Sequence, residues 1–483
     1  GLDGATSPTA SGFNAFTLIL APDATARPDA AVSGLRYVLT VPTNRWFGVL
    51  AHRDFRLYFI GRATSFIGTG MIPVALSFAI LGRGGSTSEV GWVLSADVLP
   101  LALFLLVAGV LADRINRRVV MLGADVLRCA AQAALAVWII TGRPPLWGFI
   151  VLEFVVGIGT AFFTPAMTGL IPQVTTPETL HQANALNGVA QWGGTLVGPA
   201  IAGALVATVG SGWAVAADAI SYAISVVCLV LLRVGWSGIA GEEESLARQL
   251  IEGWQAFRSR TWLWSVVAQF CTLGLIVFPP FFVLGAVVAK QSLGGAVGWG
   301  IVLACQGGGA TIAAILMLRI QPRRPMLAGE LALLSWSVIL LVLALRAPLP
   351  VVAVAGFVSG AGFGVFGPVW DTTMQRQLPP EVLSRASAYD WFGSMVLLPI
   401  GFAIEGWVSS LLGVDGTLWL GTTWLLLTVV VVLALPSVRR MTNEPIPEVV
   451  AAMRARPHGE EGFGGGHGPP FLGVERRAGS TIS

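Results

Sequence analysis

The sequence predicts an all-α integral membrane protein in which twelve transmembrane helices form two pseudo-symmetric six-helix bundles. The composition, the hydropathy pattern and an internal repeat lead to this prediction. Of the 483 residues, 54% are apolar and 11% are charged, whereas a soluble protein carries about 25% charged residues. So few charges cannot cover a water-exposed surface, and the chain therefore belongs in a lipid bilayer. The net charge of +3 is too small to indicate a nucleic acid partner.

Twelve hydrophobic stretches are each long enough to cross about 30 Å of hydrocarbon as a helix. They lie at residues 56–81, 90–111, 119–141, 146–170, 183–209, 212–233, 262–288, 296–318, 326–346, 349–370, 386–412 and 416–436. Alternate connections hold several arginines, namely Arg114, Arg117 and Arg118, then Arg233, Arg248, Arg258 and Arg260, then Arg319, Arg323 and Arg324, then Arg376 and Arg385. The positive-inside rule puts these connections in the cytoplasm. We therefore expect a multi-pass protein of the plasma (inner) membrane with both termini cytoplasmic.

The rest of the chain connects or flanks the spans. The predicted parts are a disordered cytoplasmic N-terminal arm, a first six-helix bundle, a cytoplasmic linker, a second six-helix bundle and a disordered cytoplasmic tail, at residues 1–50, 51–233, 234–261, 262–436 and 437–483. In the linker, Leu246, Leu250, Trp254 and Phe257 are spaced like the apolar face of a helix. This spacing predicts an amphipathic helix on the cytoplasmic face of the membrane.

An internal repeat relates the two bundles. At a constant spacing of 203 residues, nine residues of 157–185 recur in 360–388, among them the pairs Gly157 with Gly360 and Pro165 with Pro368. Each half holds six spans, so the two halves run in the same direction through the membrane. Transporters built in this way bind their cargo between two halves near the midplane. The repeat therefore predicts alternating access.

Several motifs resemble those of one transporter family. The turn at 109–119 matches the G-x-L-A-D-R-x-x-R-R signature of the major facilitator superfamily. The segments 52–56, 124–128, 157–166 and 183–186 resemble its enterobactin-exporter-like and macrolide-efflux-like branch, the transmembrane secretion effectors. Gly194, Gly198, Pro199 and Gly203 resemble the G-x-x-x-G-P-x-x-G-G motif associated with proton-coupled exporters. The resemblance covers about residues 52–436 and implies the major facilitator fold.

The signature turn is expected to act as a conformational latch. Its residues are Gly109, Asp113, Arg114, Arg117 and Arg118. The resemblance implies that the Asp113 carboxylate lies near the positive N-terminus of the eleventh helix when the cytoplasmic side is closed, while the arginines pair with Asp371 or Asp390. The alternative is a solvated turn that only sets topology.

The fifth-helix motif has two interpretations. Its glycines permit close helix contacts and Pro199 bends the helix, so that it serves as a pivot or seal. Ordinary packing of small residues is the alternative.

Ionisable residues inside the spans are functional candidates, because each costs at least about 2.5 kcal/mol in hydrocarbon. Glu153, Asp97 and Asp218, in that order, are the candidates for proton coupling. A desolvated carboxylate without a basic partner takes up protons more readily than one in water. The candidates for a buried ion network are Arg62, Asp125 and Arg128, because residues three apart on a helix share a face. Many relatives carry an acid in the first helix where this chain has Thr69, so two alternatives stay open: coupling through a different carboxylate, or transport without proton coupling.

The substrate cavity is expected to be lined by apolar and aromatic groups from the first, fourth, seventh and tenth helices. The candidates are Phe66, Phe163, Phe278, Phe281, Phe363 and Trp370, although each is equally compatible with facing lipid or packing internally. Such a cavity suits bulky amphipathic solutes. No histidine lies in a predicted span, and the sequence has no phosphate-binding loop or metal-spaced ligand set, so we expect no cofactor, no metal and no enzymatic activity.

The expected function is proton-coupled export of an amphipathic organic molecule such as a drug, a macrolide or a siderophore. The expected partners are a small-molecule substrate, protons and the lipid bilayer, and the protein is expected to work as a monomer. Uptake by the same fold is the first alternative, and a non-transporting membrane scaffold or sensor is the second.

Overall fold

The computed structural model describes residues 48–176, 179–233, 257–317 and 322–444, together with residues 251, 253–255 and 320. The side chains at 105–107, 109–114, 168, 181, 185, 380–382, 384 and 385 are also outside the description. Almost all of the expected N-terminal arm, most of the linker and most of the tail therefore lie outside the described residues. Every regular element in the described part is a helix.

The first half consists of six long helices. They are α2 (Arg53–Gly82), α3 (Thr87–Arg114), α4 (Arg117–Thr141), α5 (Leu146–Leu170), α6 (Leu180–Thr208) and α7 (Ser211–Leu231). Each is long enough to cross a membrane, and each matches one of the first six predicted spans. The short turns between them, such as the one ended by Asn116, whose side chain accepts from the Arg118 backbone N–H, make consecutive helices antiparallel.

The second half has more interruptions. Its elements are α9 (Thr261–Ile276), η4 (Pro280–Leu284), α10 (Gly285–Ser292), α11 (Gly295–Met317), α12 (Pro325–Leu333), α13 (Ser335–Ala344), α14 (Leu349–Gln377), α15 (Pro380–Met395), α16 (Leu398–Ala434) and α17 (Pro436–Arg439). The elements α9, η4 and α10 together make one crossing, and so do α12 and α13. At η4 the backbone forms a π-helical turn just after Pro279, where proline removes a helical hydrogen bond.

One glycine accounts for the number of crossings. Eleven helical stretches among the described residues are long and apolar enough to span a membrane, and the last of them, Ala386–Ala434, is 49 residues long. Within it, Gly413 has φ 74 and ψ 164, a left-handed conformation that glycine adopts without steric cost. The chain turns back there, so this stretch crosses twice. The described helices thus make twelve crossings, and the predicted fold class is confirmed.

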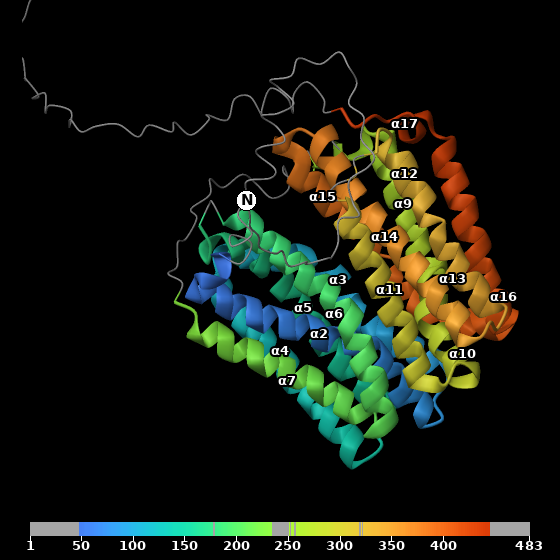
Figure 1. Ribbon diagram of the computed structural model, residues 1–483. Coiled ribbons are helices and arrows are strands. Elements are labelled where there is room, and N and C mark those ends of the chain that lie inside the picture. The colour runs from blue at the N-terminus through green and yellow to red at the C-terminus, as the bar shows by residue number, and fades with distance from the viewer. Residues whose placement is uncertain are drawn as a thin grey trace, which may run out of the picture.

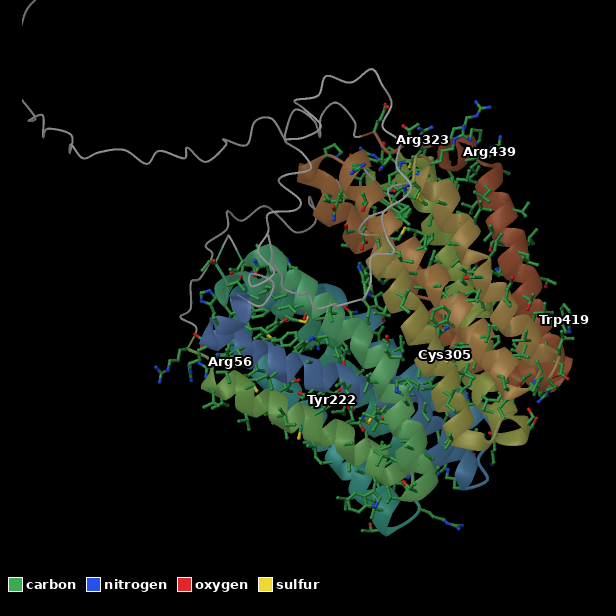
Figure 2. The ribbon with its side chains drawn as sticks, in the orientation of Figure 1. Arg56, Tyr222, Cys305, Arg323, Trp419 and Arg439 are labelled. Carbon is green, nitrogen blue, oxygen red and sulfur yellow. The ribbon has the colours of Figure 1, made fainter. Side chains whose placement is uncertain are left out.

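The two halves meet at one end of the molecule and separate at the other (Figure 1). They converge beside α10 and diverge toward α15 and α17, so that Arg56 of the first half lies far from Arg323 and Arg439 of the second (Figure 2). We call the converging end the closed end and the other the arginine-rich end. At the closed end, the Trp92 side chain donates to the Ala403 carbonyl at 3.0 Å and Ser95 donates to the Pro399 carbonyl at 2.8 Å.

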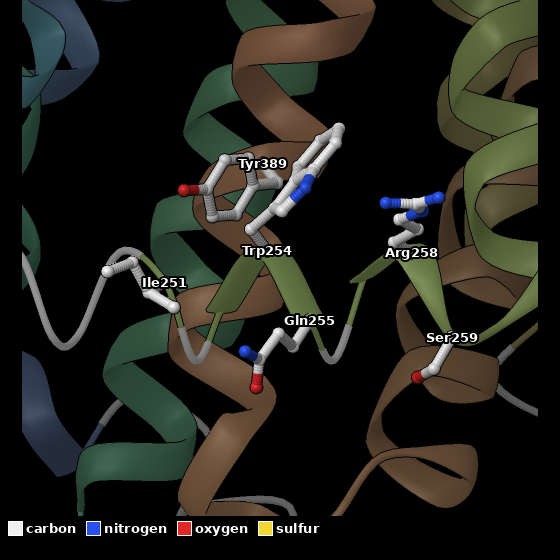
Figure 3. Close-up of a pocket in the computed structure, with 6 residues that line it drawn as sticks. All are labelled: Ile251, Trp254, Gln255, Arg258, Ser259 and Tyr389. Carbon is white, nitrogen blue, oxygen red and sulfur yellow. The ribbon is translucent and has the colours of Figure 1, made fainter.

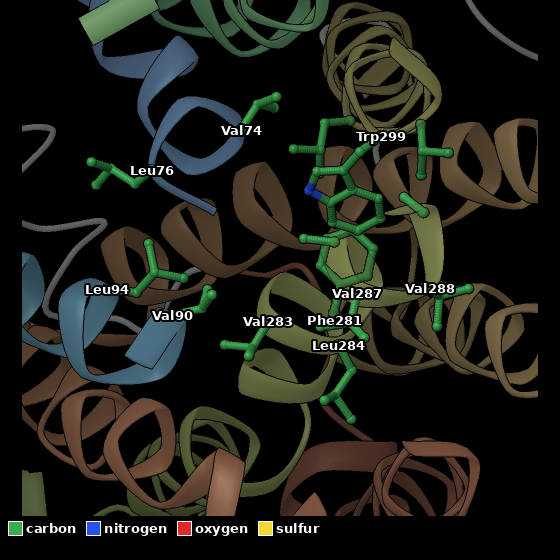
Figure 4. Close-up of a cluster of buried hydrophobic side chains, with 14 of the residues drawn as sticks. Val74, Leu76, Val90, Leu94, Phe281, Val283, Leu284, Val287, Val288 and Trp299 are labelled. Atoms are coloured by element: carbon green, nitrogen blue, oxygen red, sulfur yellow. The ribbon is translucent and has the colours of Figure 1, made fainter. Parts of the chain in front are cut away.

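The hydrophobic cores follow the same division. One large cluster at the closed end joins Leu76 and Val90 of the first half to Val283 and Leu284 of the second (Figure 4). At the arginine-rich end each half has a cluster of its own, one around Phe55 and the other around Met326. Close packing of this cluster and the two hydrogen bonds join the halves at the closed end in this conformation.

Candidate functional site

A cavity of about 440 Å³ lies between the two halves. It is bordered by α2 and α6 of the first half and by η4, α11, α13 and α14 of the second. Its aromatic lining residues are Phe66, Trp192, Phe282, Trp336 and Phe363, and its polar ones are Thr69, Gln191, Thr195 and Gln306. None of the described residues that line it is charged. The cavity therefore offers ring faces and a few hydrogen-bonding groups to a ligand, without a fixed counter-charge.

Two of the six expected wall residues line this cavity, namely Phe66 and Phe363. Phe278 packs behind them, with its ring centroid 5.1 Å from that of Trp336. The other three lie elsewhere: Phe163 is buried within the first half, Phe281 packs on Trp299, and Trp370 packs on Trp262 near the arginine-rich end.

Sequence reasoning missed the contributions of α6, α11 and α13 to the cavity. Trp192, Gln306 and Trp336 all come from these three helices. Gln191 and Gln306 could have indicated the cavity from the sequence, because amide side chains are costly in hydrocarbon unless they meet a hydrogen-bond partner or a cavity.

The glycines of the fifth-helix motif serve two different contacts of α6. A Cβ at Gly194 would collide with the backbone of Phe66, and one at Gly198 would collide with Gly70. These two glycines therefore bring α6 close to α2 in the same half. Gly203 instead faces α11 of the other half, where a Cβ would lie 2.8 Å from the Ala296 carbonyl oxygen. The motif thus extends from an internal contact into the seam between the halves.

The three predicted proton-coupling residues come together in the first half, each from a different helix. Glu153 of α5 lies within electrostatic range of Asp97 of α3 and Asp218 of α7. The side chains of Glu153 and Asp218 are fully buried. Gln132 donates to Glu153 Oε1 at 3.4 Å, and Ser221 donates to Asp218 Oδ1 at 3.3 Å. Within the described structure, Glu153 Oε2 and Asp218 Oδ2 have no hydrogen-bond partner.

Next to these carboxylates lies the predicted ion network. Arg128 donates to Asp125 Oδ1, and Ser225 donates to Asp125 Oδ2 at 2.5 Å. The Phe163 ring contacts two guanidinium groups, with its centroid 4.3 Å from Arg128 Cζ and 5.0 Å from Arg62 Cζ. The aromatic ring attracts both cations. Arg62 thus joins the network through Phe163.

A chain of contacts links the cavity to this charged cluster. Thr69 lines the cavity, and its hydroxyl lies 3.2 Å from the Tyr222 hydroxyl. The Tyr222 ring centroid in turn lies 4.4 Å from Arg128 Cζ. Arg128 acts electrostatically on both Asp97 and Asp218. Tyr222 and Arg128 thus lie between the cavity wall and the carboxylate cluster.

The predicted latch is only partly described. The side chains of Gly109, Asp113 and Arg114 lie outside the described residues. Arg117 donates to the Gly169 carbonyl at 2.7 Å, and Arg118 donates to the Leu229 carbonyl at 2.7 Å. These two arginines thus bind the helix ends of their own half in this conformation.

The acids considered as partners of the latch lie in the second half. Asp390 accepts a hydrogen bond from the Trp370 indole at 3.0 Å and one from Ser394 at 3.4 Å. Asp371 is exposed. Arg118 and Asp390 each form these hydrogen bonds within their own half.

Two further buried acids in the second half were not predicted. Glu330 of α12 is fully buried and accepts a hydrogen bond from Gln269 at 3.0 Å. Glu405 of α16 is 2% exposed. Both lie inside predicted spans, so a search of the second-half spans for ionisable residues would have found them.

The described part of the linker is helical and packs on α15. Trp254 and Phe257 stack with ring centroids 5.7 Å apart, and the Tyr389 ring lies 5.6 Å from the first and 6.0 Å from the second. Figure 3 shows Trp254 beside Tyr389, with Arg258 further along the same segment. The apolar face predicted for this helix thus contacts protein at these two positions, while Leu246 and Leu250 lie outside the described residues.

The sequence model of the Major Facilitator Superfamily matches residues 58–392. The chain belongs to this superfamily of membrane transport proteins. It is 23% identical over 396 residues to macrolide efflux protein A of Streptococcus pyogenes, covering 81% of this chain and 96% of that protein. It is 26% identical over 406 residues to the multidrug efflux pump Tap of Mycolicibacterium fortuitum, covering 78% of this chain and 94% of that protein.

Solved structures of similar fold are also transporters. The nucleoside transporter NupG matches with a TM-score of 0.64 and 13% identity, covering 79% of this chain and 98% of NupG. A bacterial homologue of the human lysosomal transporter Spinster, in an inward-facing and unoccupied conformation, matches with a TM-score of 0.60 and 15% identity, over 82% of this chain and 99% of that chain. At these identities the likeness shows the fold alone. The protein is therefore a multi-pass membrane transporter whose relatives include efflux pumps.

Proposed function

We propose that the protein is a secondary active transporter that exports an amphipathic organic solute, such as a drug, a macrolide or a siderophore, in exchange for protons. One observation carries this proposal: an uncharged aromatic cavity between the halves is linked through Thr69 and Tyr222 to a buried carboxylate cluster. The cavity suits a large apolar ligand with few polar groups. The names of the two efflux relatives agree with such a cargo.

The orientation in the membrane follows from the distribution of arginines. We place the arginine-rich end, with Arg118, Arg323 and Arg376, in the cytoplasm of a bacterial cell. The described conformation is then open toward the cytoplasm and closed toward the outside. Export requires a second conformation in which the halves separate at the closed end and meet at the arginine-rich end. In that second state Asp113 is expected to approach the N-terminus of α15, and the arginines of the same turn to pair with Asp371 or Asp390.

Proton coupling is assigned first to Glu153, with Asp97 and Asp218 as alternatives. Glu153 is fully buried and has one oxygen without a hydrogen-bond partner among the described residues. Such a carboxylate is far more stable as the neutral acid while the site is closed to water. Protonation from outside and release inside, once in each cycle, would drive the return of the empty transporter.

The test is a transport assay in proteoliposomes with an imposed pH gradient and a labelled macrolide as the probe. Accumulation should follow the gradient and disappear when an ionophore collapses it. Unchanged accumulation would exclude proton antiport. Cargo movement that runs with the protons instead of against them would favour the uptake alternative, and the absence of any flux would favour a scaffold or sensor.

The latch has its own test. Asp113→Asn is expected to slow the transport cycle without weakening cargo binding, because the cavity lies away from the signature turn. A loss of binding with an unchanged cycling rate would contradict the latch. The same reconstitution at a density of one chain per liposome tests whether the monomer is sufficient.

A further inference from the structure

The seam between α3 and α16 at the closed end contains a buried acid that the transport proposal has not used. Glu405 is 2% exposed, and its Oε1 has no hydrogen-bond partner in the described part of the chain. It faces α3, where an ideal Cβ on Gly91 would lie 3.9 Å from Glu405 Cβ. The buried side chain of Glu405 therefore leaves α16 at the contact between the halves.

Neighbouring contacts define how tight this seam is. Trp92 and Ser95 of α3 donate to carbonyls of α16 on one side of Glu405, at 3.0 and 2.8 Å. On the other side, Gly406 lies directly against Ser88, so that any side chain at this glycine would collide. Glu405 is 2% exposed in this conformation, and separation of α3 and α16 would open it to water.

Among the described residues, no charged group is paired with Glu405. On α3 the nearest acid in sequence to the seam, Glu89, is paired with Arg83 at 2.6 Å, and Asp97 belongs to the cluster in the first half. The elements α9, η4 and α13 have no charged residue. Glu330 of α12 accepts from Gln269, and the basic residue of α17, Arg439, lies at the arginine-rich end.

The physical consequence concerns the ionised form. A carboxylate without partner or water costs several kcal/mol more than the neutral acid. For Glu405, burial without a charged partner favours the neutral acid while the seam is closed, and ionisation becomes easier when α3 and α16 separate and water enters. The proton comes from the water at the closed end when the seam forms, and it returns to that water when the seam opens.

We propose that Glu405 is a second proton-binding residue, separate from the Glu153 cluster, and that its protonation stabilises the contact between α3 and α16. This rests on the proposed function, because it assumes that the closed end opens during transport. The other seam, between α6 and α11, is built on Gly203 and Gly300 and holds no acid among its described contacts. External acid thus favours the conformation described here, which is the one that receives cargo from the cytoplasm.

The test measures the seam directly and needs no transport. Spin labels are placed at Ser86, directly before α3, and at Ser410 of α16, both exposed, in the full chain with its four cysteines replaced. Distances are measured by pulsed electron resonance in lipid nanodiscs from pH 4.5 to 9. The short-distance population should be greatest at low pH, and the ratio of closed to open molecules should fall by up to about tenfold per pH unit, as expected for one proton.

Variants distinguish the effect of Glu405 on the pH response from the effects of other acids. Glu405→Gln should stay closed at every pH, and Glu405→Met, which is also neutral and of similar size, should behave in the same way if the first variant folds poorly. The controls Glu89→Gln and Asp415→Asn should keep the wild-type response, because the first acid is paired with Arg83 and the second is half-exposed beside Arg346.

Two results would overturn the proposal: wild-type distances that do not change with pH, or a pH response that persists unchanged in Glu405→Gln. Failure of the proposed function gives a different combination of results in the transport assay and the distance measurement. If transport ignores the pH gradient while the distances still respond through Glu405, the seam is acid-sensitive without proton-driven export. If transport is proton-driven and the distances do not respond, only the assignment to Glu405 fails.

Discussion

The two halves of the protein bury charge in different ways. In the described first half, four charged side chains are buried, Asp125, Arg128, Glu153 and Asp218, and they form one connected cluster with Asp97. In the described second half only Glu330 and Glu405 are buried, they lie on different helices, and no arginine or lysine is buried. The second half has instead a continuous set of rings, in which Trp336 contacts Phe278, Phe281 and Phe363.

This difference shows that the two copies of a duplicated unit can keep one fold and still take on different roles. The residues that the halves share in register are mostly glycine, proline and alanine, which shape helix contacts, so both halves keep the same fold. The positions between them are free to diverge. We infer that the first half supplies the connected cluster of buried charges, whereas both halves line the cargo cavity and the second half contributes three of its five aromatic rings.

The proposed difference between the halves is tested most directly by neutralising one buried glutamate in each half. Glu153 and Glu330 are matched, because each is fully buried and accepts one hydrogen bond from a glutamine amide. Glu153→Gln should abolish accumulation driven by a pH gradient and leave downhill exchange of cargo intact. Glu330→Gln should preserve gradient-driven accumulation. Both are measured in proteoliposomes with a labelled macrolide.

Reversed results for these two variants would place the coupling site in the second half. Full activity of Glu153→Gln, with loss of activity in Asp97→Asn, would instead move the assignment within the first half. In either case, binding of cargo to the detergent-solubilised variants serves as the control for folding.

The next largest effect is on stability, and it also differs between the halves. Arg128→Met leaves Asp125 buried with only Ser225 as a described hydrogen-bond donor, and breaking a buried pair costs about 3–5 kcal/mol. The exposed pair of the second half, Arg346 with Asp415 at 2.8 Å, should contribute no more than about 1 kcal/mol. Thermal unfolding in detergent should therefore separate Arg128→Met from Arg346→Ala by many degrees.

A double variant checks the cause of this loss. Asp125→Asn combined with Arg128→Met removes both charges and should recover much of the stability. If the double variant is as unstable as Arg128→Met alone, the arginine acts mainly through its stacking on Phe163 and Tyr222, and the ion pair is secondary.

The sequence predicted the fold better than the site, for a physical reason. Membrane spans must be long and apolar, so hydropathy locates all twelve crossings, and the break at Gly413 falls between two predicted spans. Depth in the membrane also follows from counting residues, so the three acids of the first half could be grouped before their contacts were known.

The residues of the cavity wall could not be predicted in this way. Helices such as α2 and α14 are apolar on all sides, so periodicity does not distinguish the face toward the cavity from the face toward lipid. For this reason Phe163, Phe281 and Trp370 were expected at the wall, and Trp192 and Trp336 were not.

A cargo-binding experiment measures how much the aromatic rings of the second half contribute to binding. Trp336 lies at the cavity wall and supports Phe363, with ring centroids 5.6 Å apart. Trp336→Ala should weaken macrolide binding about tenfold, since the loss of an aromatic contact is worth about 0.5–1.5 kcal/mol beyond its buried area. The matched control is Trp407→Ala, whose side chain is 64% exposed on α16, and it should bind as the wild type does. Equal losses in both variants would point to a general effect on folding.

The smallest expected effect concerns the link between the halves. Trp254 belongs to the segment that follows the first half, yet it packs on Tyr389 of α15 in the second half, with ring centroids 5.6 Å apart. Trp254→Ala should lower the unfolding temperature by only a few degrees, because one such ring contact contributes about 0.5–1.5 kcal/mol. Trp391→Ala, an exposed tryptophan on the same helix, should change it less. If Trp254→Ala leaves stability unchanged but slows transport, then the contact of the linker with α15 matters for movement of the halves, and the linker has to be counted as part of the transport cycle.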